Sequence, residues 1–257
     1  MSLKPEQVAI IIPARYASTR FPGKPLCSIS GTPMIEHVYK RALKAKLASS
    51  VIVATDDERI ARAVEAFDGQ YIMTRSDHAT GTDRLAEVAS KMPQIEVIVN
   101  VQGDEPLIDP ANIDKAIEPL LNDDNVKMST LAYEMTQEHE MQNPMIVKVV
   151  LDNNGFALYF SRAAIPYYRD SASDTSAPIK RLGHTGLYVY RRQCLLDIAK
   201  MPVASLERAE QLEQLRALQN GVKIKVMVAT RSAPAVDVPE DVLKIEKIMS
   251  ELGAMSK

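Results

Sequence analysis

The sequence predicts an α/β protein in which helices cover both faces of a mainly parallel sheet. Short apolar runs rich in β-branched residues recur along the chain, as expected of strands that are buried on both faces. Segments with the apolar spacing of helices lie between these runs. Because strands that alternate with helices normally pair in parallel, these observations predict three layers, with the sheet between two layers of helices.

The individual elements follow from local patterns. Strands are expected in the runs VAIII, VIVAT, VIVNV, VKVVL and KIKVMVAT, which begin at Val8, Val51, Val97, Val147 and Lys223. Helices are expected at residues 33–46, 57–67, 82–91 and 110–121, several of them opened by Pro, Thr or Asp. A further helix is expected at 206–220, ended by Gly221 in a left-handed conformation, and a last one starts near Pro239.

Chain length favours one domain spanning residues 1–257, because a chain of this size can bury a core without disulfides or a structural metal. Within it, residues 157–190 hold two aromatic stretches separated by a polar Ser/Asp/Thr segment. We interpret this part as a small inserted sub-region and a candidate oligomer contact. No motif repeats with a period between about 20 and 50 residues, which excludes solenoid folds.

Charge and cysteine content narrow the class of partner. With 31 basic and 33 acidic residues, the net charge of -2 gives no overall attraction to nucleic acid or to anionic membranes. Cys27 and Cys194 lie far apart and form neither a disulfide framework nor a zinc spacing. The apolar run 8–12 is too short for a signal peptide or a membrane span. A cytoplasmic protein is therefore expected.

The segment IIPARYASTRFPGKPL, residues 11–26, is the strongest indication of chemistry. A buried strand leads directly into a loop that carries Arg15, Arg20 and Lys24. In an open parallel sheet such a loop lies at the carboxyl edge, where ligands bind. Three cations within ten residues, with Ala14 and Gly23 allowing close backbone approach, suit a triphosphate better than a single carboxylate. The alternative is a solvated basic turn.

This loop is not a Walker A motif. Lys24 is followed by Pro25 rather than Ser or Thr, and Ser18 stands where the first glycine should be. The chain also has no GxGxxG fingerprint, which argues against a dinucleotide oxidoreductase.

Two acidic residues are candidates for holding a metal over the phosphates. In VNVQGDEP a strand ends just before Asp104, which places this carboxylate at the same sheet edge as the basic loop. Mg²⁺ takes few protein carboxylates, so one more acid from a distant loop would suffice, and Asp237 in VDVPED is our candidate. The alternatives are a turn residue for Asp104 and a helix N-cap before Pro239 for Asp237.

Seven stretches in order resemble the 3-deoxy-manno-octulosonate (Kdo) cytidylyltransferases, also called CMP-Kdo synthetases. Besides the basic loop, these are MTRSDHATGTDRLAE from Met73, VNVQGDEPLI from Val99, NPMIVKVVLD from Asn143, ALYFSRAAIP from Ala157, LEQLRAL from Leu212 and VDVPEDV from Val236. The resemblance covers almost the whole chain. It implies the Rossmann-like fold of the nucleotide-diphospho-sugar transferases, Mg²⁺ as cofactor and a homodimer, without a nucleic-acid or membrane partner.

The implied reaction joins CMP from CTP to a Kdo-type sugar acid, releases pyrophosphate and activates the sugar for lipopolysaccharide synthesis. We expect the anomeric hydroxyl at C2 to attack the α-phosphorus in line, with metal activation because no general base is evident. The catalytic residues would be Arg15, Arg20, Lys24, Asp104 and Asp237, the last two as metal ligands.

The resemblance also implies nucleotide-binding residues, with Thr80 standing where the family commonly has Ser. Residues 75–84 would contact the cytosine and ribose, although Thr82 and Asp83 could equally form a helix N-terminal box before Leu85. The implied nucleotide-binding set is Pro13, Ala14, Arg15, Arg20, Lys24, Arg75, His78, Thr80, Gly81 and Arg84.

For the sugar acid, the resemblance implies a second set, in which Arg162 could pair with the sugar's carboxylate. Glu207, Glu210 and Gln214 follow i, i+3, i+7 spacing, so one helical face could offer several acceptors, although a solvated helix face is the alternative. The implied sugar-binding set, partly within 157–190, is Gln102, Arg162, His184, Tyr188, Glu207, Glu210 and Gln214.

One departure from the family bears on the sugar. Gly183 precedes His184, whereas family members usually have Lys or Arg there. Loss of that cation would leave room for a substrate with its own positive charge, and some enzymes of this type act on the 8-amino-8-deoxy analogue of Kdo. We therefore hypothesise that this chain acts on the analogue.

Two other functions stay open. A nucleotidyltransferase on the same scaffold could use another sugar acid or a sugar phosphate. The sugar-side residues Arg162, His184 and Glu210 argue against a sugar phosphate, because the sequence has no second basic cluster to bind its monophosphate. A non-catalytic nucleotide-sensing domain is the other, and the presence of Asp104 and Asp237 argues against it.

Overall fold

The computed structural model describes residues 3–17, 21–78, 80–167, 180–231 and 233–255. The chain divides into two compact units, the first formed by Met1–Asp114 with Ser232–Lys257 and the second by Lys115–Arg231. That residues 1–257 form one domain stays a prediction. Within the described ranges, no helix has the length and apolar character needed to cross a membrane.

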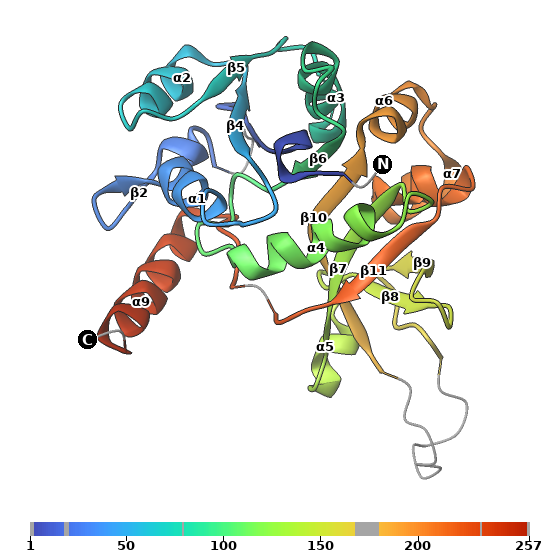
Figure 1. Cartoon of the computed structure of the whole chain (residues 1–257). Coiled ribbons are helices and arrows are strands. Elements are labelled where there is room, and N and C mark those ends of the chain that lie inside the picture. The colour runs from blue at the N-terminus through green and yellow to red at the C-terminus, as the bar shows by residue number, and fades with distance from the viewer. Residues whose placement is uncertain (1–2, 18–20, 79, 168–179, 232, 256–257) are drawn as a thin grey trace. The chain divides into compact units, whose positions relative to one another are not determined.

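The first unit is built on four parallel strands in the order β6 (Val97–Asn100), β1 (Val8–Ala14), β4 (Ser50–Thr55) and β5 (Tyr71–Met73) (Figure 1). Residues 8–12 of β1 are completely buried, because this strand lies between two others and under helices on both faces. Three of the four strands coincide with predicted apolar runs. The short strand β5 was not predicted.

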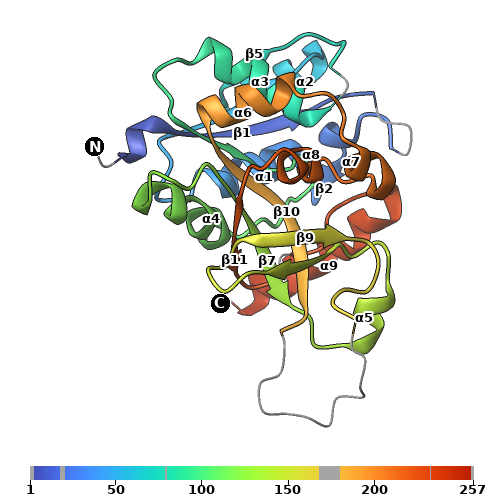
Figure 2. The ribbon, with the colours of Figure 1, turned by 90° about the vertical axis from the view of Figure 1, so that its right-hand side faces the viewer.

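Helices α1 (Met34–Ala42) and α3 (Gly81–Lys91) pack against β1 from opposite sides (Figure 2). Capping residues define where the helices begin: Asp57 accepts a hydrogen bond from the amide of Arg59 at the start of α2 (Glu58–Glu65). Helix α9 (Pro239–Met255) begins near Pro239 as predicted, and α4 (Pro110–Asn122) spans the division between the units. Helix α1 ends four residues earlier than predicted, with turns following Ala42.

A buried apolar cluster in the first unit joins segments that are far apart in sequence. Ile29 comes from the hairpin of β2 (Ser28–Ile29) and β3 (Thr32–Pro33), Met34 from α1, and Leu107 from the loop after β6. Val236 and Ile245 come from the segment leading into α9 and from α9 itself. The segments that carry Asp104 and Asp237 are therefore packed on one core.

The second unit contains a mixed sheet. Strand β11 (Ile224–Val228) runs parallel to β7 (Met128–Glu134), which pairs antiparallel with β10 (Leu182–Arg191). Strand β10 also pairs antiparallel with β8 (Lys148–Leu151), which in turn pairs with β9 (Ala157–Ser161). The predicted sub-region 157–190 contains β9 and all of β10 except its last residue, whereas its polar Ser/Asp/Thr segment lies outside the described residues. Its role as an oligomer contact stays a prediction.

The prediction of one continuous helix over residues 206–220 is wrong. Two short helices, α7 (Ser205–Glu210) and α8 (Gln214–Gln219), are separated by Gln211, whose φ of 54° is left-handed. The amide of Leu212 donates to the carbonyl of Glu207 at 3.3 Å, and the Leu212 side chain is buried, so the chain turns to place this leucine in the core. Gly221 has a φ of 81°, as predicted for a left-handed residue after the helix.

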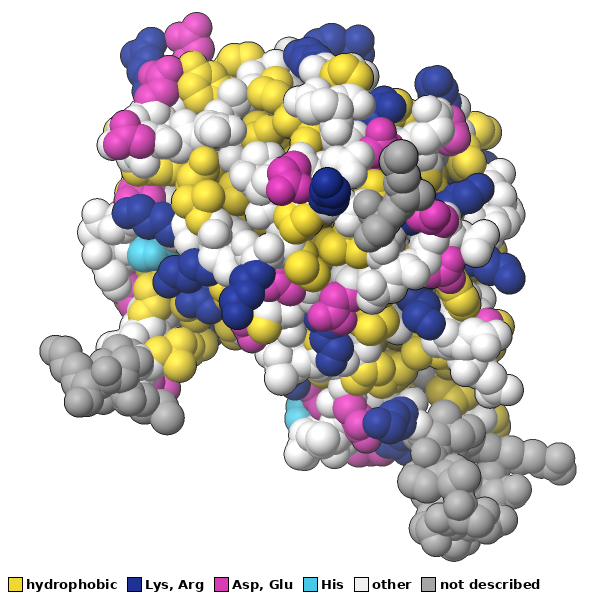
Figure 3. Space-filling model, in the orientation of Figure 1, with side chains coloured by type: hydrophobic (Ala, Val, Ile, Leu, Met, Phe, Trp, Pro, Cys, Tyr) yellow, Lys and Arg dark blue, Asp and Glu magenta, His cyan; other side chains and the backbone are white. Residues whose placement is uncertain are grey.

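Two further helices complete the second unit, α5 (Glu138–Gln142) and α6 (Arg192–Lys200). Acidic and basic side chains are interspersed over the face shown in Figure 3, in keeping with the small net charge.

Candidate active site

Gly23, near the end of the basic loop after β1, packs against the ring of Tyr16. Gly23 has a φ of 70°, and its amide donates to the carbonyl of Tyr16 at 2.9 Å. A Cβ on Gly23 would lie 3.0 Å from the Tyr16 ring, so the turn requires glycine for both its conformation and the close contact. The guanidinium carbon of Arg59 lies 3.3 Å from the centroid of the same ring. Tyr16 therefore holds Gly23, the residue before Lys24, in place.

The Lys24 ammonium lies near both predicted metal-binding carboxylates. Its ammonium group donates to Asp104 Oδ2 at 2.7 Å and to the carbonyl of Val236 at 3.0 Å. Asp237 Oδ1 lies 3.9 Å from the same nitrogen. Although these residues are more than 200 positions apart at the extremes, all three belong to the first unit.

Close contact between the ends of β1 and β6 accounts for this convergence. A Cβ on Gly103 would lie 2.9 Å from the carbonyl oxygen of Pro13, so only glycine lets the segment after β6 pass this close to β1. The amide of Val236 then donates to the carbonyl of Asp104 at 2.9 Å and ties the second acidic segment to the first. The backbone itself thus holds the two acids near each other.

The remaining residues of the triphosphate loop are placed differently. Arg15 is exposed at the end of β1, next to the buried Ala14 and the partly buried Pro13. Arg20 lies outside the described residues. Burial, with the charge of Asp104 adding to it, raises the pKa of Glu105 to about 8, so at neutral pH this carboxyl is mostly uncharged.

Around the start of α3, the described residues of the segment 75–84 form local ion pairs. Thr80 and Asp83 make a capping box, so the helix-box interpretation holds for Asp83. Buried Arg84 donates to Asp56 at 3.1 Å and to the hydroxyl of Thr74. Arg75 and Gly81 are exposed, and Arg75 pairs with Asp77 at 2.9 Å.

His78 lies 2.5 Å from Glu87. Burial alone would raise the pKa of Glu87, but hydrogen bonds from Lys91, Arg75 and His78 outweigh it and lower the pKa to about 2. That Arg75, His78, Thr80, Gly81 and Arg84 contact the nucleotide stays a prediction, as does the same role for Pro13, Ala14 and Arg15.

In the second unit, Arg162 and Glu210 fasten β9 to α7. Arg162 Nε donates to the carbonyl of Glu210 at 2.8 Å, and Nη1 donates to that of Pro144 at 3.1 Å. The carboxylate of Glu210 accepts hydrogen bonds from the Ser161 hydroxyl at 2.6 Å and from the Arg162 amide at 2.9 Å. These contacts give both side chains a structural role, and their contact with the sugar stays a prediction.

Glu207 and Gln214 do not share one helical face, because α7 ends at Glu210 and Gln214 begins α8. Glu207 forms a buried two-point ion pair with Arg216, at 2.9 and 2.6 Å. Gln214 is also buried, and its Nε2 is left without a hydrogen-bond partner among the described residues. A buried donor of this kind is available to a ligand hydroxyl.

His184 is fixed in its neutral form. Its Nε2 lies 2.9 Å from the hydroxyl oxygen of Thr130, whose own hydrogen has an acceptor in the carbonyl of Leu187 at 2.7 Å. His184 Nε2 therefore donates to Thr130. The rings of Phe160 and Tyr188 lie 5.0 and 5.3 Å away, and burial lowers the pKa of His184 to about 3.

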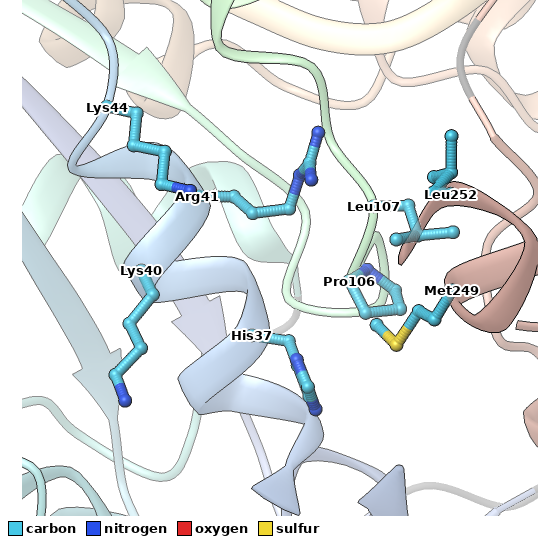
Figure 4. Close-up of a pocket in the computed structure, with 8 residues that line it drawn as sticks. All are labelled: His37, Lys40, Arg41, Lys44, Pro106, Leu107, Met249 and Leu252. Carbon is cyan, nitrogen blue, oxygen red and sulfur yellow. The ribbon is translucent and has the colours of Figure 1, made fainter. Parts of the chain in front are cut away.

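A pocket of roughly 280 Å³ elsewhere in the first unit contains none of the predicted site residues (Figure 4). Arg41 Nε donates to the carbonyl of Ile108, and His37 Nε2 lies 2.9 Å from the carbonyl of Ile29. The pocket is lined by His37, Lys40, Arg41, Lys44, Pro106, Leu107, Met249 and Leu252. Two of its polar side chains thus already form hydrogen bonds with the backbone of the protein.

Comparison with known proteins identifies the family. A cytidylyltransferase family model matches residues 9–224. The 3-deoxy-manno-octulosonate cytidylyltransferase of Geobacter sulfurreducens is 52% identical over 251 residues, covering 95% of this chain and 99% of that protein. The enzyme of the same name from Trichlorobacter lovleyi is 51% identical, with the same coverage. The chain belongs to the 3-deoxy-manno-octulosonate cytidylyltransferase family.

Solved structures agree with this family and with the predicted fold class. A CMP:2-keto-3-deoxy-manno-octonic acid synthetase complexed with CTP matches with a TM-score of 0.90 and 41% identity, over 96% of this chain and 99% of that one. A cytidylyltransferase from Leptospira borgpetersenii, only 18% identical, matches with a TM-score of 0.63 over 96% of this chain and 87% of that one, and shows the fold alone. The predicted α/β nucleotidyltransferase fold is confirmed.

Gly183 lies under an aromatic ring. It pairs with Tyr133 across β10 and β7, and a Cβ there would lie 2.6 Å from Tyr133 Cζ. The guanidinium carbon of Arg231 lies 4.7 Å from the centroid of this ring, and Arg231 pairs with the buried Glu140. The space beside Gly183 is therefore filled by Tyr133, contrary to the expectation that it is open.

Sequence reasoning missed Tyr16, Gly103 and Tyr133. Each of the three shapes the structure through a contact with a residue elsewhere in the chain. Only Gly103 could have been singled out from the local sequence, because it is a glycine between a predicted strand and an acidic residue.

The depressed pKa of His184 predicts a specific pH dependence of stability. Unfolding restores an ordinary histidine pKa near 6.5, so between about pH 6.5 and pH 3 the unfolded chain binds a proton that the folded chain does not. The free energy of unfolding should therefore fall on acidification, by up to ~1.4 kcal/mol per pH unit from this group. Urea denaturation of His184→Gln should show a shallower fall than the wild type.

His139→Gln provides the matched control, since His139 is exposed on α5 in the same unit. Equal pH slopes for His184→Gln and the wild type would contradict a neutral imidazole at this position.

Proposed function

We propose that this protein is a Mg²⁺-dependent cytidylyltransferase that joins CMP from CTP to a Kdo-type sugar acid and releases pyrophosphate. The observation that carries the proposal is the meeting of Lys24, Asp104 and Asp237 at the end of a basic loop. The relatives at 51–52% identity bear the name of this activity, and a solved relative contains CTP. We also propose a cytoplasmic homodimer that supplies the activated sugar for lipopolysaccharide synthesis.

The donor atoms around Lys24 fit Mg²⁺. Asp104 and Asp237 offer carboxylate oxygens, and Val236 offers a carbonyl oxygen that lies near the same Lys24 nitrogen. When a Mg²⁺ site also holds phosphates, the protein usually supplies only a few oxygen ligands, and phosphate oxygens and water supply the others. When bound, the ion would neutralise phosphate charge and lower the pKa of the attacking hydroxyl.

The residues of the chain supply position and charge. Lys24 and the exposed Arg15 offer cations to the triphosphate, and Arg20 is proposed to add a third. The turn ordered by Tyr16 and Gly23 fixes the direction from which Lys24 reaches the ligand. With these groups on the phosphates, the anomeric hydroxyl of the sugar acid attacks the α-phosphorus in line and pyrophosphate leaves.

On the sugar side, Gln214 has the best structural support, because its buried amide nitrogen can donate to a sugar hydroxyl. Gln102, Arg162, His184, Tyr188, Glu207 and Glu210 complete the proposed set. For Arg162, Glu207 and Glu210 the proposal includes a positioning role, since each already holds another segment in place.

Replacing Asp237 tests the metal site. Asp237→Asn removes a charge from the proposed metal ligand without changing its size, so kcat for pyrophosphate release from CTP, Mg²⁺ and Kdo should fall at least ~100-fold. The thermal unfolding temperature should change little, because the amides of Asp237 and Val238, just before α9, donate to the Asp241 carboxylate, which the substitution leaves in place.

Asp68→Asn is the matched control, because Asp68 is exposed in the same unit and its left-handed φ of 59° suits asparagine. Full activity of Asp237→Asn with Mg²⁺ would count against the assignment.

The identity of the sugar is a separate question. We hypothesise that the chain acts on the 8-amino-8-deoxy analogue of Kdo, because residue 183 carries no cation that would repel the amino group, an argument from charge that stands although Tyr133 fills the space beside Gly183. Steady-state kinetics with both sugars should then give a higher kcat/KM for the amino sugar. A clear preference for Kdo would remove this hypothesis while leaving the cytidylyltransferase assignment intact.

A further inference from the structure

Lys24 occupies the position between the two acids that a bound cation would take. Its ammonium lies 2.7 Å from Asp104 Oδ2 and 3.9 Å from Asp237 Oδ1, and it also donates to the Val236 carbonyl. These are the same oxygen atoms that make up the proposed metal site. The Lys24 side chain is only 16% exposed, so its contacts are shielded from solvent on most sides.

The two acids are held near each other without help from the lysine. The backbone hydrogen bond from Val236 to Asp104 joins their segments at 2.9 Å. Leu107 and Val236 are buried in one apolar cluster, which also holds together the two segments that carry Asp104 and Asp237. A variant without the ammonium should therefore keep the carboxylates where they are.

The backbone of Lys24 is also fixed, whereas its ammonium is not. Pro25 is buried, and the 3-10 helix η2 (Lys24–Leu26) is closed by a hydrogen bond from Cys27 to the Lys24 carbonyl at 3.1 Å. Between this backbone and the ammonium lies a flexible four-carbon stem. The charge can thus move between partners while the loop stays in place.

A divalent ion and this ammonium cannot share one carboxylate oxygen at short distance, because like charges a few ångströms apart repel strongly. A triphosphate brought to the loop offers the ammonium new anionic partners. We propose that Lys24 serves as a cationic placeholder, which closes the metal site in the nucleotide-free protein and opens it when the triphosphate binds.

This inference rests on the proposed function, and it adds a coupling between two ligands. Metal binding is weak without CTP and strong with it, and by linkage the metal strengthens CTP binding by the same factor. Lys24 therefore has a role before the reaction, in addition to its contact with the phosphates.

The test measures Mn²⁺ binding to the full-length chain by electron paramagnetic resonance, without nucleotide and with a non-hydrolysable CTP analogue. Without nucleotide, Lys24→Met should bind Mn²⁺ about 10-fold more tightly than the wild type, within the range typical of coupled sites. The strengthening of Mn²⁺ binding by the analogue should be correspondingly smaller in this variant.

Lys40→Met is the matched control, because Lys40 lies on α1 in the same unit and pairs with Glu36. This variant also loses one positive charge, but at a position distant from Asp104 and Asp237, so its Mn²⁺ affinity should equal that of the wild type. Lys24→Gln, a polar replacement, should repeat the result of Lys24→Met. Circular dichroism establishes that each variant is folded.

Equal Mn²⁺ affinity of Lys24→Met, Lys24→Gln and the wild type without nucleotide would overturn the inference. Failure of both variants to fold would also overturn it, because the acids would then depend on the lysine. If the wild type releases pyrophosphate from CTP and Kdo, but the variants bind Mn²⁺ no more tightly than the wild type, only the placeholder role of Lys24 is wrong. If the wild type releases none, the proposed function fails.

Discussion

The close approach of the ends of β1 and β6 is the constraint on which the candidate site depends. Gly103 passes so near the carbonyl of Pro13 that no side chain fits, and this contact places Asp104 beside the loop that carries Lys24. The backbone bond from Val236 then adds Asp237 to the same place. These two contacts thus bring a cation and two acids from three segments together, and they are the groups to which we assign the nucleotidyltransferase chemistry.

Several of the polar residues proposed to bind the sugar also form contacts that stabilise the fold. Arg162 and Glu210 join β9 to α7, and Glu207 pairs with Arg216 between α7 and α8. A buried ion pair is costly to break because each partner would leave an uncompensated charge. Loss of activity on mutation of these residues would therefore not by itself establish sugar contact, whereas Gln214 has a donor that the fold does not use.

Much of the first unit could be predicted from sequence because its signals are local. The apolar runs of β1, β4 and β6 identify buried strands, and Lys24 and Asp104 follow two of them at the carboxyl edge. The second unit was harder to predict. A left-handed Gln211 has no sequence signature, so the break between α7 and α8 was missed. The contact of Tyr133 with Gly183 joins strands 50 residues apart, and no local pattern reports it.

The most direct test of the central claim is a crystal structure of the protein with Mg²⁺ and CTP. Our account predicts that Asp104 and Asp237 both place an oxygen about 2.1 Å from one Mg²⁺, the distance that this ion requires. It also predicts that the Lys24 ammonium contacts a phosphate oxygen rather than Asp104. A nucleotide-bound Mg²⁺ with Asp237 outside its coordination shell would contradict the account.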